Sequence, residues 1–225
     1  MLSLNIGILI LSFGIVLTIF ANVGFAPWEV FHWGIAQTTG ISLGRVNIIA
    51  SLVIITIAIL LGEKAGIGTF INIILIGVYI DLYIYLGFIP KMNSLLPGIL
   101  MLISGLFLIA LGTALYMAAG YGAGPRDSLM VALERKTGLA VGICRSIIEL
   151  TVCFVGWLLG GLVGIGTVIS IFASGLCVQI VFTLLRFDAT KVKHETMDVT
   201  FKAIKKYFLE DKLKENLKDK VKEEV

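Results

Sequence analysis

The sequence repeats itself at a fixed offset, and this repeat limits the possible folds more than any other feature. The stretch GFAPWE at residues 24–29 returns as GAGPRD at residues 122–127, which is 98 positions later. Both copies read Gly-x-x-Pro and carry an acidic residue two positions after the proline. Because proline is favoured at the first position of a helix, each copy predicts a turn that opens a helical segment.

The same offset pairs a second motif, Gly-Ile-Gly-Thr, at residues 66–69 and 164–167. One offset that serves two motifs indicates a duplicated unit, with repeat 1 at about residues 1–91 and repeat 2 at about residues 92–187. The motif residues that the offset pairs are Gly24 with Gly122, Pro27 with Pro125, Gly66 with Gly164, Gly68 with Gly166, and Thr69 with Thr167.

The duplicated part is too apolar for a soluble domain. The chain of 225 residues is 58% hydrophobic with a mean hydropathy of +1.00, well above ordinary globular composition. Residues 188–225 hold ten of the 18 basic and nine of the 15 acidic residues. We therefore expect an all-α, polytopic membrane domain at residues 1–187, followed by a Lys/Glu-rich amphipathic helical tail that lies on the inner membrane surface or against the loops.

Six uncharged or nearly uncharged segments are long enough to cross a bilayer, which needs about 20 apolar residues. The first is expected to be retained and not cleaved as a signal peptide, because no Lys or Arg precedes it and its repeat partner is internal. The predicted spans are residues 4–20, 41–61, 66–89, 96–118, 139–159 and 162–185.

Each repeat also predicts one short helix, at residues 27–39 and 125–137, that ends before a glycine. Such a helix reaches only roughly 20 Å and cannot span. The sequence leaves open whether these half-helices lie at the membrane interface or dip into the bundle.

Lysine and arginine predict the orientation, because cytoplasmic loops are enriched in them. The Lys-rich tail and the cations of residues 126–136 fall on one side of a six-span topology, so both termini are expected in the cytoplasm. Three spans per repeat is an odd number, so the two repeats are expected to be inserted upside-down relative to each other. Residues 24–40 would then face outside and residues 122–138 inside.

Polar residues within the predicted spans are candidates for a substrate or ion pathway, since an ionisable group near the bilayer centre is costly and usually faces a cavity or a partner. Arg145 and Glu149 lie one helical turn apart, and the repeat pairs them with Asn47 and Ser51. Two interpretations remain open: a structural ion pair, or a gate or substrate contact.

Asp81 is the strongest candidate for a protonatable or cation-binding group, because no cation lies near it in sequence; its repeat partner is Gln179. Glu29 and Asp127 lie in the first turns of the half-helices. An acidic group there either caps the helix or, if the helix tips reach a central cavity, binds a cation or a proton.

Enzyme chemistry finds little support in the sequence. The chain has two histidines and three cysteines, and the cysteines lie in apolar runs without paired spacing. We expect no catalytic residues, cofactor, metal site or nucleic-acid partner.

With its doubled proline element and doubled Gly-Ile-Gly-Thr turn, the chain resembles the YczE/YyaS/YitT group of bacterial integral membrane proteins over about residues 1–187. The resemblance implies a bacterial cytoplasmic membrane location and a helical membrane fold. It implies no substrate and carries over no binding residue.

Inverted repeats with short or interrupted helices are typical of secondary transporters. We therefore expect a transporter-like protein that moves a small polar solute or ion. The alternative is a solute-binding or accessory subunit that acts with a partner complex. Besides lipid, a homo-oligomer remains possible as a partner.

The predicted topology can be tested by cysteine labelling after the native cysteines are replaced. A cysteine at Gln37 should react with an impermeant thiol reagent from outside the cell, and one at Lys136 only from inside. Labelling of both positions from the same face would contradict inverted repeats.

Overall fold

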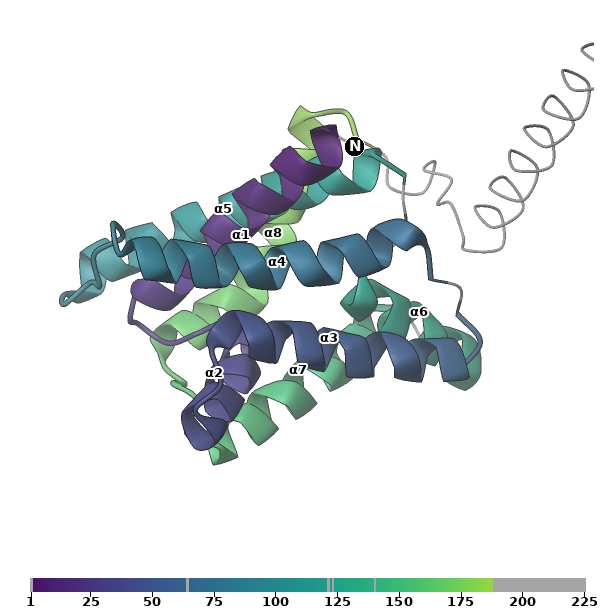
Figure 1. Ribbon diagram of the computed structural model, residues 1–225, viewed down its shortest axis with the longest axis horizontal. Helices are drawn as coiled ribbons and strands as arrows, with labels where there is room; N and C mark the ends of the chain where they lie inside the picture. The colour runs from purple at the N-terminus through teal and green to yellow at the C-terminus, as the bar shows by residue number, and fades with distance from the viewer. Residues whose placement is uncertain (1, 64, 121, 123, 140, 188–225) are drawn as a thin grey trace, which may run out of the picture.

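The structure is a computed structural model that describes residues 2–63, 65–120, 122, 124–139 and 141–187. Within these residues it contains eight α-helices and no strand (Figure 1). The predicted tail at residues 188–225 and Lys64 lie outside the described residues. The helices are α1 Leu2–Phe20, α2 Pro27–Thr39, α3 Leu43–Leu60, α4 Ile67–Leu86, α5 Leu95–Ala118, α6 Pro125–Thr137, α7 Val141–Leu158 and α8 Ile165–Leu184.

The two half-helices, α2 and α6, have the bounds predicted for them. Each begins with its proline, which has no amide hydrogen to leave unpaired. Each ends before a glycine in the left-handed conformation, Gly40 with φ 70° and Gly138 with φ 71°. A residue with a Cβ is strained in that conformation, so glycine stops both helices at the same point.

Five helices, α1, α3, α4, α5 and α8, are long and apolar enough to cross a membrane, counted over the described residues. The fifth predicted span corresponds to α7, an 18-residue helix that is not among these five. Large apolar side chains cover the outside of the bundle: Leu60 is 81% and Phe172 is 73% exposed. An apolar exterior on this scale requires a lipid environment, so the chain is a helical membrane protein.

Antiparallel α1 and α5 form the most extensive helix pair, and they meet through glycines. A Cβ on Gly7 would lie 2.9 Å from the carbonyl oxygen of Gly112, and one on Gly14 would lie 2.7 Å from that of Gly105. The 98-residue offset pairs Gly7 with Gly105 and Gly14 with Gly112. The two contacts are therefore equivalents of each other, and small residues allow this close approach of backbones in lipid.

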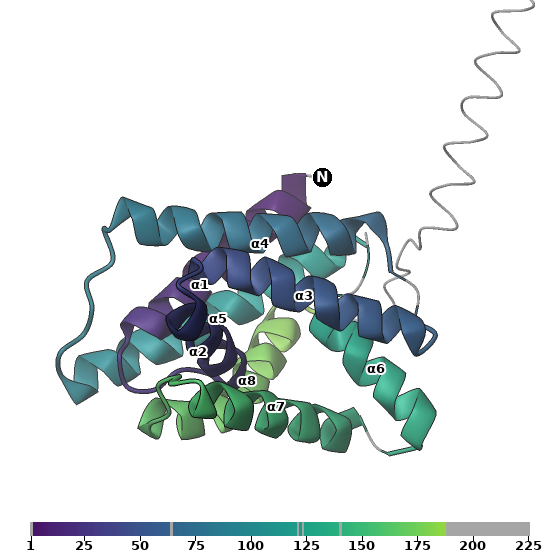
Figure 2. The same ribbon diagram turned by 60° about the horizontal axis from the view of Figure 1, so that its bottom comes forward.

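Each half-helix packs against a long helix of the other repeat (Figure 2). α2 contacts α7, where a Cβ on Gly34 would lie 2.5 Å from the carbonyl oxygen of Gly156. α6 contacts α3, where the equivalent positions, Ala132 and Ala58, are also small and fully buried. The repeats are therefore interlocked, not simply adjacent.

The loop before each half-helix also packs against the other repeat. Gly24, with φ 112°, packs on Gly164, and the adjacent amide of Phe25 donates a 3.0 Å hydrogen bond to Leu162. Gly122, with φ 132°, packs on Thr69 of the other Gly-Ile-Gly-Thr motif. Each Gly-x-x-Pro motif thus contacts the Gly-Ile-Gly-Thr motif of the other repeat, which explains why both motifs recur together.

The glycine contact between α1 and α5 predicts a large difference between two glycine substitutions. A Cβ on Gly105 would lie 2.8 Å from the carbonyl oxygen of Gly14, whereas one on Gly175 of α8 meets no atom within 4 Å in the part of the chain that the structure describes. Gly105→Ala should destabilise the protein by about 1–3 kcal/mol, because the helices must separate. Gly175→Ala should leave stability unchanged. Thermal unfolding in detergent measures both, and equal effects would contradict the packing described.

Candidate functional site

The N-terminal turns of the two half-helices meet each other. The Arg126 guanidinium of α6 lies over the Trp28 ring of α2, with its central carbon 4.7 Å from the ring centroid. These two residues are repeat partners, and equivalent residues can touch only where the two repeats meet. A cation over an indole face is a favourable contact, which counts here because the positive ends of both helix dipoles disfavour a cation at this position.

Glu29 is buried beside this contact. Its Oε1 lies 3.6 Å from Nη2 of Arg126. Burial raises the pKa of the Glu29 carboxyl above its ordinary value, and the Arg126 charge opposes that shift. Arg126 is thus the counter-ion that keeps a buried carboxylate tolerable at this position.

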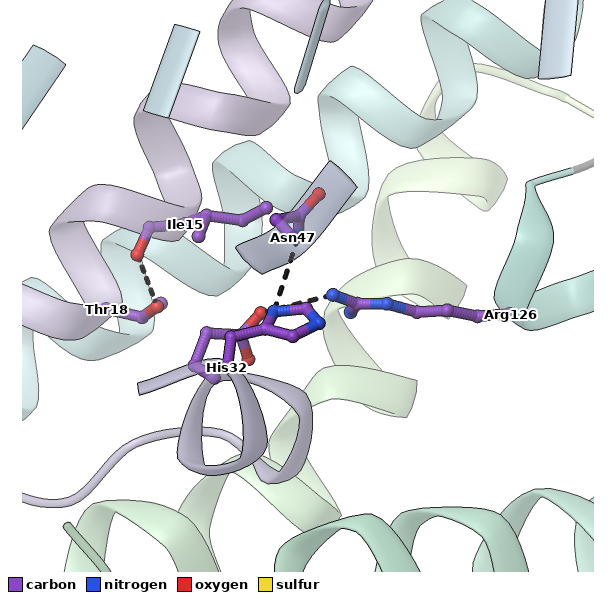
Figure 3. Close-up of polar contacts among 6 residues, drawn as sticks. Ile15, Thr18, His32, Asn47 and Arg126 are labelled. Atoms are coloured by element: carbon purple, nitrogen blue, oxygen red, sulfur yellow. Dashed lines mark hydrogen bonds and ion pairs between the residues drawn. The ribbon is translucent and has the colours of Figure 1, made fainter. Parts of the chain in front are cut away.

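One turn after Glu29, the buried imidazole of His32 hydrogen-bonds Asn47 of α3; its Nδ1 lies 3.3 Å from Asn47 Nδ2 (Figure 3). Nε2 of His32 is also buried and has no hydrogen-bond partner among the described residues. Burial, assisted by the Arg126 charge, lowers the pKa of His32 well below its ordinary value. The ring is therefore neutral and retains one unused hydrogen-bonding nitrogen.

A small cavity of about 90 Å³ opens beside the two helix tips, between α2, α6 and α7. This is room for about three water molecules or one small solute. The cavity combines two guanidinium groups with two carboxylates. Its lining residues are Trp28, Arg126, Asp127, Met130, Arg145, Ile148 and Glu149.

The structure brings Arg145 and Glu149 together as the sequence spacing predicts. Arg145 Nε donates a 2.9 Å hydrogen bond to Glu149 Oε1 on the cavity wall. The Arg145 side chain is 48% exposed, so the pair is accessible, not sealed in the bundle. Asn47 and Ser51, their repeat partners, are both buried on α3.

Asp127 is held by a residue from α5. The Tyr116 hydroxyl and the Asp127 carboxylate lie together against Gly124, where a Cβ would come 3.2 Å from Tyr116 Oη and 3.3 Å from Asp127 Oδ2. Asp127 therefore joins α6 to α5 while it lines the cavity. Glu29, its repeat partner, pairs with Arg126 instead.

Asp81 has hydrogen-bond partners that its neighbours in sequence do not reveal. Its carboxylate accepts a 2.6 Å hydrogen bond from Ser42 Oγ and a 2.7 Å hydrogen bond from the amide of Gly44. Asp81 therefore satisfies the free N-terminus of α3 from the C-terminal part of α4. Gln179 is exposed on α8, and neither Asp81 nor Gln179 lines the cavity.

Sequence reasoning missed several residues that build the site, namely Trp28, His32, Tyr116 and Arg126. The available signal was the offset itself, since it makes Trp28 and Arg126 neighbours of the paired acids and repeat partners of each other. His32 gave no such signal, because its repeat partner is the apolar Met130.

A second, larger cavity of about 420 Å³ was also not foreseen. It lies where the C-terminal end of α1, the half-helix α2 and the turn before α8 meet, and it is mainly apolar. The residues that line it are Ile19, Phe20, Asn22, Phe25, Trp33, Gln37, Lys91, Gly160 and Leu162. Over the described residues, no group of three or more His, Cys, Asp or Glu side chains is placed to hold a metal ion.

Comparison with known proteins identifies the family. The family of unknown function DUF6198 matches residues 1–183 of the chain. The chain belongs to this family. Its DUF6198 match covers the eight helices up to the last turn of α8, so the cavity and both half-helices lie inside the matched region.

Curated relatives agree with the membrane fold. The uncharacterized membrane protein YczE of Bacillus subtilis is 37% identical over 175 residues, covering 77% of this chain and 80% of YczE. An uncharacterized protein of Haemophilus influenzae is 34% identical and covers 78% of this chain and 80% of its own. YyaS of Bacillus subtilis is 29% identical, with 78% and 89% covered. The resemblance to YczE and YyaS is confirmed. No solved structure matches the chain.

The buried pair predicts a pH-dependent effect. Arg126→Gln removes the counter-ion of Glu29 and should destabilise the protein, with the greatest loss near pH 8. A carboxyl whose folded pKa is raised loses stability as the pH rises, so the loss should shrink as the pH falls and Glu29 takes up a proton. Thermal unfolding across pH 5–8 measures this effect.

The control is the double variant Glu29→Gln/Arg126→Gln, which leaves no charge unpaired and should recover most of the stability at pH 8. A single variant whose loss is independent of pH, or a double variant that is no better than Arg126→Gln, would contradict the pairing.

Proposed function

We propose that this chain is a six-span, inverted-repeat membrane protein that moves a small polar solute or ion across the bacterial cytoplasmic membrane. The cavity at the tips of α2 and α6 is its solute site. One observation carries the proposal: two helices too short to span meet at their N-termini beside a cavity that combines charges of both signs. Half-helix tips that point at a central site are the usual construction of secondary transporters.

Three contacts support an inverted arrangement of the repeats. The glycine contacts of α1 with α5 are antiparallel and equivalent to each other. Each half-helix packs on a helix of the other repeat, α2 on α7 and α6 on α3. Each Gly-x-x-Pro motif likewise contacts the Gly-Ile-Gly-Thr motif of the other repeat. If every residue is replaced by its repeat partner, these contacts map onto each other, as expected for two units related by a two-fold axis. The equivalent helices α1 and α5 are antiparallel, which favours an axis in the membrane plane.

The charges of the cavity favour a zwitterionic solute. Arg145 is already paired with Glu149, and Arg126 with Glu29. A simple cation or anion that enters would compete with one member of a pair and leave the other unpaired, which is costly in a desolvated site. A small molecule with both an anionic and a cationic group can satisfy both members. No catalytic residue or cofactor forms part of this function.

The orientation belongs to the same proposal. The distribution of lysine and arginine favours a cytoplasmic position for both termini. The tip of α2 is then reached from outside and the tip of α6 from inside, although both tips contribute to one site. Such a site can be opened to either side by small movements of the surrounding helices.

The outer faces of α7 and α8 keep a second candidate open, a solute-binding subunit of a larger membrane complex. Leu150, Phe172 and Leu176 are all more than half exposed on these helices. Lipid can cover such a surface, and so can a partner subunit. The two functions differ in whether the purified protein moves solute alone.

The proposal predicts binding followed by transport. A thermal-shift screen of small amino acids, betaines, amines, carboxylates and inorganic ions should give a stabilising compound, most strongly among the zwitterions. The shift should be lost in Glu149→Gln and kept in the control Gln179→Ala, because Glu149 lines the cavity and Gln179 does not. The same compound, radiolabelled, should accumulate in liposomes that contain the protein alone.

If the protein binds the compound but the liposomes do not accumulate it, the result would favour the binding subunit. A stabilising compound whose effect survives both Glu149→Gln and Arg145→Asn would contradict the cavity as the solute site. Stabilisation by simple anions or cations but by no zwitterion would overturn the solute class.

A further inference from the structure

The two repeats have the same elements, but their last two helices are packed differently. In repeat 1, α3 lies along α4 (Figure 2), and a Cβ on Gly77 would lie 2.5 Å from the carbonyl oxygen of Gly44. Asp81 adds its two hydrogen bonds to the N-terminus of α3. Ile73 of α4 is consequently only 1% exposed. The α3–α4 pair is closed.

In repeat 2, α7 and α8 form no comparable contact over the described residues. Gly175, the repeat partner of Gly77, has no atom of the described residues within 4 Å of the position of its Cβ. Ile171, the repeat partner of Ile73, is 37% exposed. The α7–α8 pair is therefore open, although α8 keeps the glycine that closes the equivalent pair.

The residues beside the half-helix tips also differ between the two repeats: they are buried in repeat 1 and accessible in repeat 2. In repeat 1 the imidazole of His32 fills the space beside Asn47, and both side chains are buried. The equivalent residues of repeat 2, Met130 and Arg145, line the cavity and leave it accessible. The cavity thus lies on the side of the open helix pair, and its equivalent on the side of the closed pair is filled.

We propose that the chain has a second state in which the α3–α4 pair is open and the α7–α8 pair is closed. In that state His32, Asn47 and Ser51 form the open half of the solute site. α3 separates from α4, and α7 packs on α8 at Gly175. The inference rests on the proposed function in one respect: the exchange gives the same solute site access to the other side of the membrane.

The second state is available because it uses contacts the fold already contains. Two similar units in opposite orientation can adopt each other's packing at a similar free energy. Gly44 and Gly77 have Gly142 and Gly175 as sequence equivalents. Asp81 has no acidic equivalent, since its partner is Gln179, so its hydrogen bonds favour the state described here.

The unused nitrogen of His32 identifies the chemistry of the second half-site. Within the described part of the chain, Nε2 is buried without a hydrogen-bond partner, a costly arrangement that a solute or water would relieve once the space beside it opens. Asn47 of α3 contacts the His32 ring, Glu29 one turn earlier on α2 pairs with Arg126 of α6, and Glu149 of α7 lines the adjacent cavity. The half-site thus offers neutral hydrogen-bonding groups beside the shared Glu29–Arg126 pair, and it fits the same small zwitterion.

Two matched pairs of spin labels test the exchange. After Cys144, Cys153 and Cys177 are replaced, one pair is placed at Ile41 and Tyr85, beside the α3–α4 contact. The other is placed at their repeat equivalents, Leu139 and Thr183. All four positions are exposed. In lipid nanodiscs the first pair should give the shorter distance and the second pair the longer one.

Gly77→Ala should exchange these distances, because the added Cβ cannot fit against the Gly44 carbonyl oxygen. The Ile41–Tyr85 distance should lengthen, and the Leu139–Thr183 distance should shorten to that of the closed pair. The matched control Gly175→Ala should keep both original distances, since its Cβ meets open space. Combined with Gly77→Ala, it should prevent the shortening.

Lengthening of the first pair without shortening of the second, or no change in either, would overturn the exchange. If Gly77→Ala fails to fold, the double variant Ser42→Ala/Asp81→Asn weakens the same contact without a clash and must shift the distances in the same direction. Uptake into liposomes with fixed distances would refute the exchange but not the transport function. Exchange of distances without uptake of any compound would refute transport alone.

Discussion

A helix too short to cross the bilayer must keep its charged tip inside the protein, where each charge needs a partner, and the rest of this structure depends on how that is done. The two half-helices meet this constraint together. Arg126 at the tip of α6 lies over Trp28 and beside Glu29 at the tip of α2. Neither tip is complete without the other, so the central contact ties the two repeats into one unit.

The close helix contacts follow from the same constraint. A half-helix can reach the centre only if its loop and its sides fit tightly against the opposite repeat, and each of the contacts described above includes a glycine or an alanine. Gly24 on Gly164 and Gly34 on Gly156 are examples in which an added Cβ would clash with backbone. The repeated glycines that reveal the duplication in the sequence are therefore the residues that allow the repeats to interlock.

The fold could be predicted further than the site. Proline and glycine have local conformational preferences, so the bounds of both half-helices could be read directly, and the i,i+4 spacing of Arg145 and Glu149 predicted their contact. The hydrogen bonds of Asp81 could not be predicted, because its partners, Ser42 and Gly44, lie about 40 positions earlier. The role of His32 and the open α7–α8 pair could not be predicted. Both depend on a difference in packing between equivalent helices, whereas the repeat offset predicts the same packing in both repeats.

The central claim is that two oppositely oriented repeats meet at the tips of their half-helices within the membrane. An experimental structure of the protein in a lipid nanodisc measures this most directly. It should show Arg126 against Trp28 near the bilayer centre, with residues 1–85 superposing on residues 99–183 after a rotation of about 180° about an axis in the membrane plane. Half-helices that lie apart on the two membrane surfaces, or repeats related by an axis along the membrane normal, would contradict it.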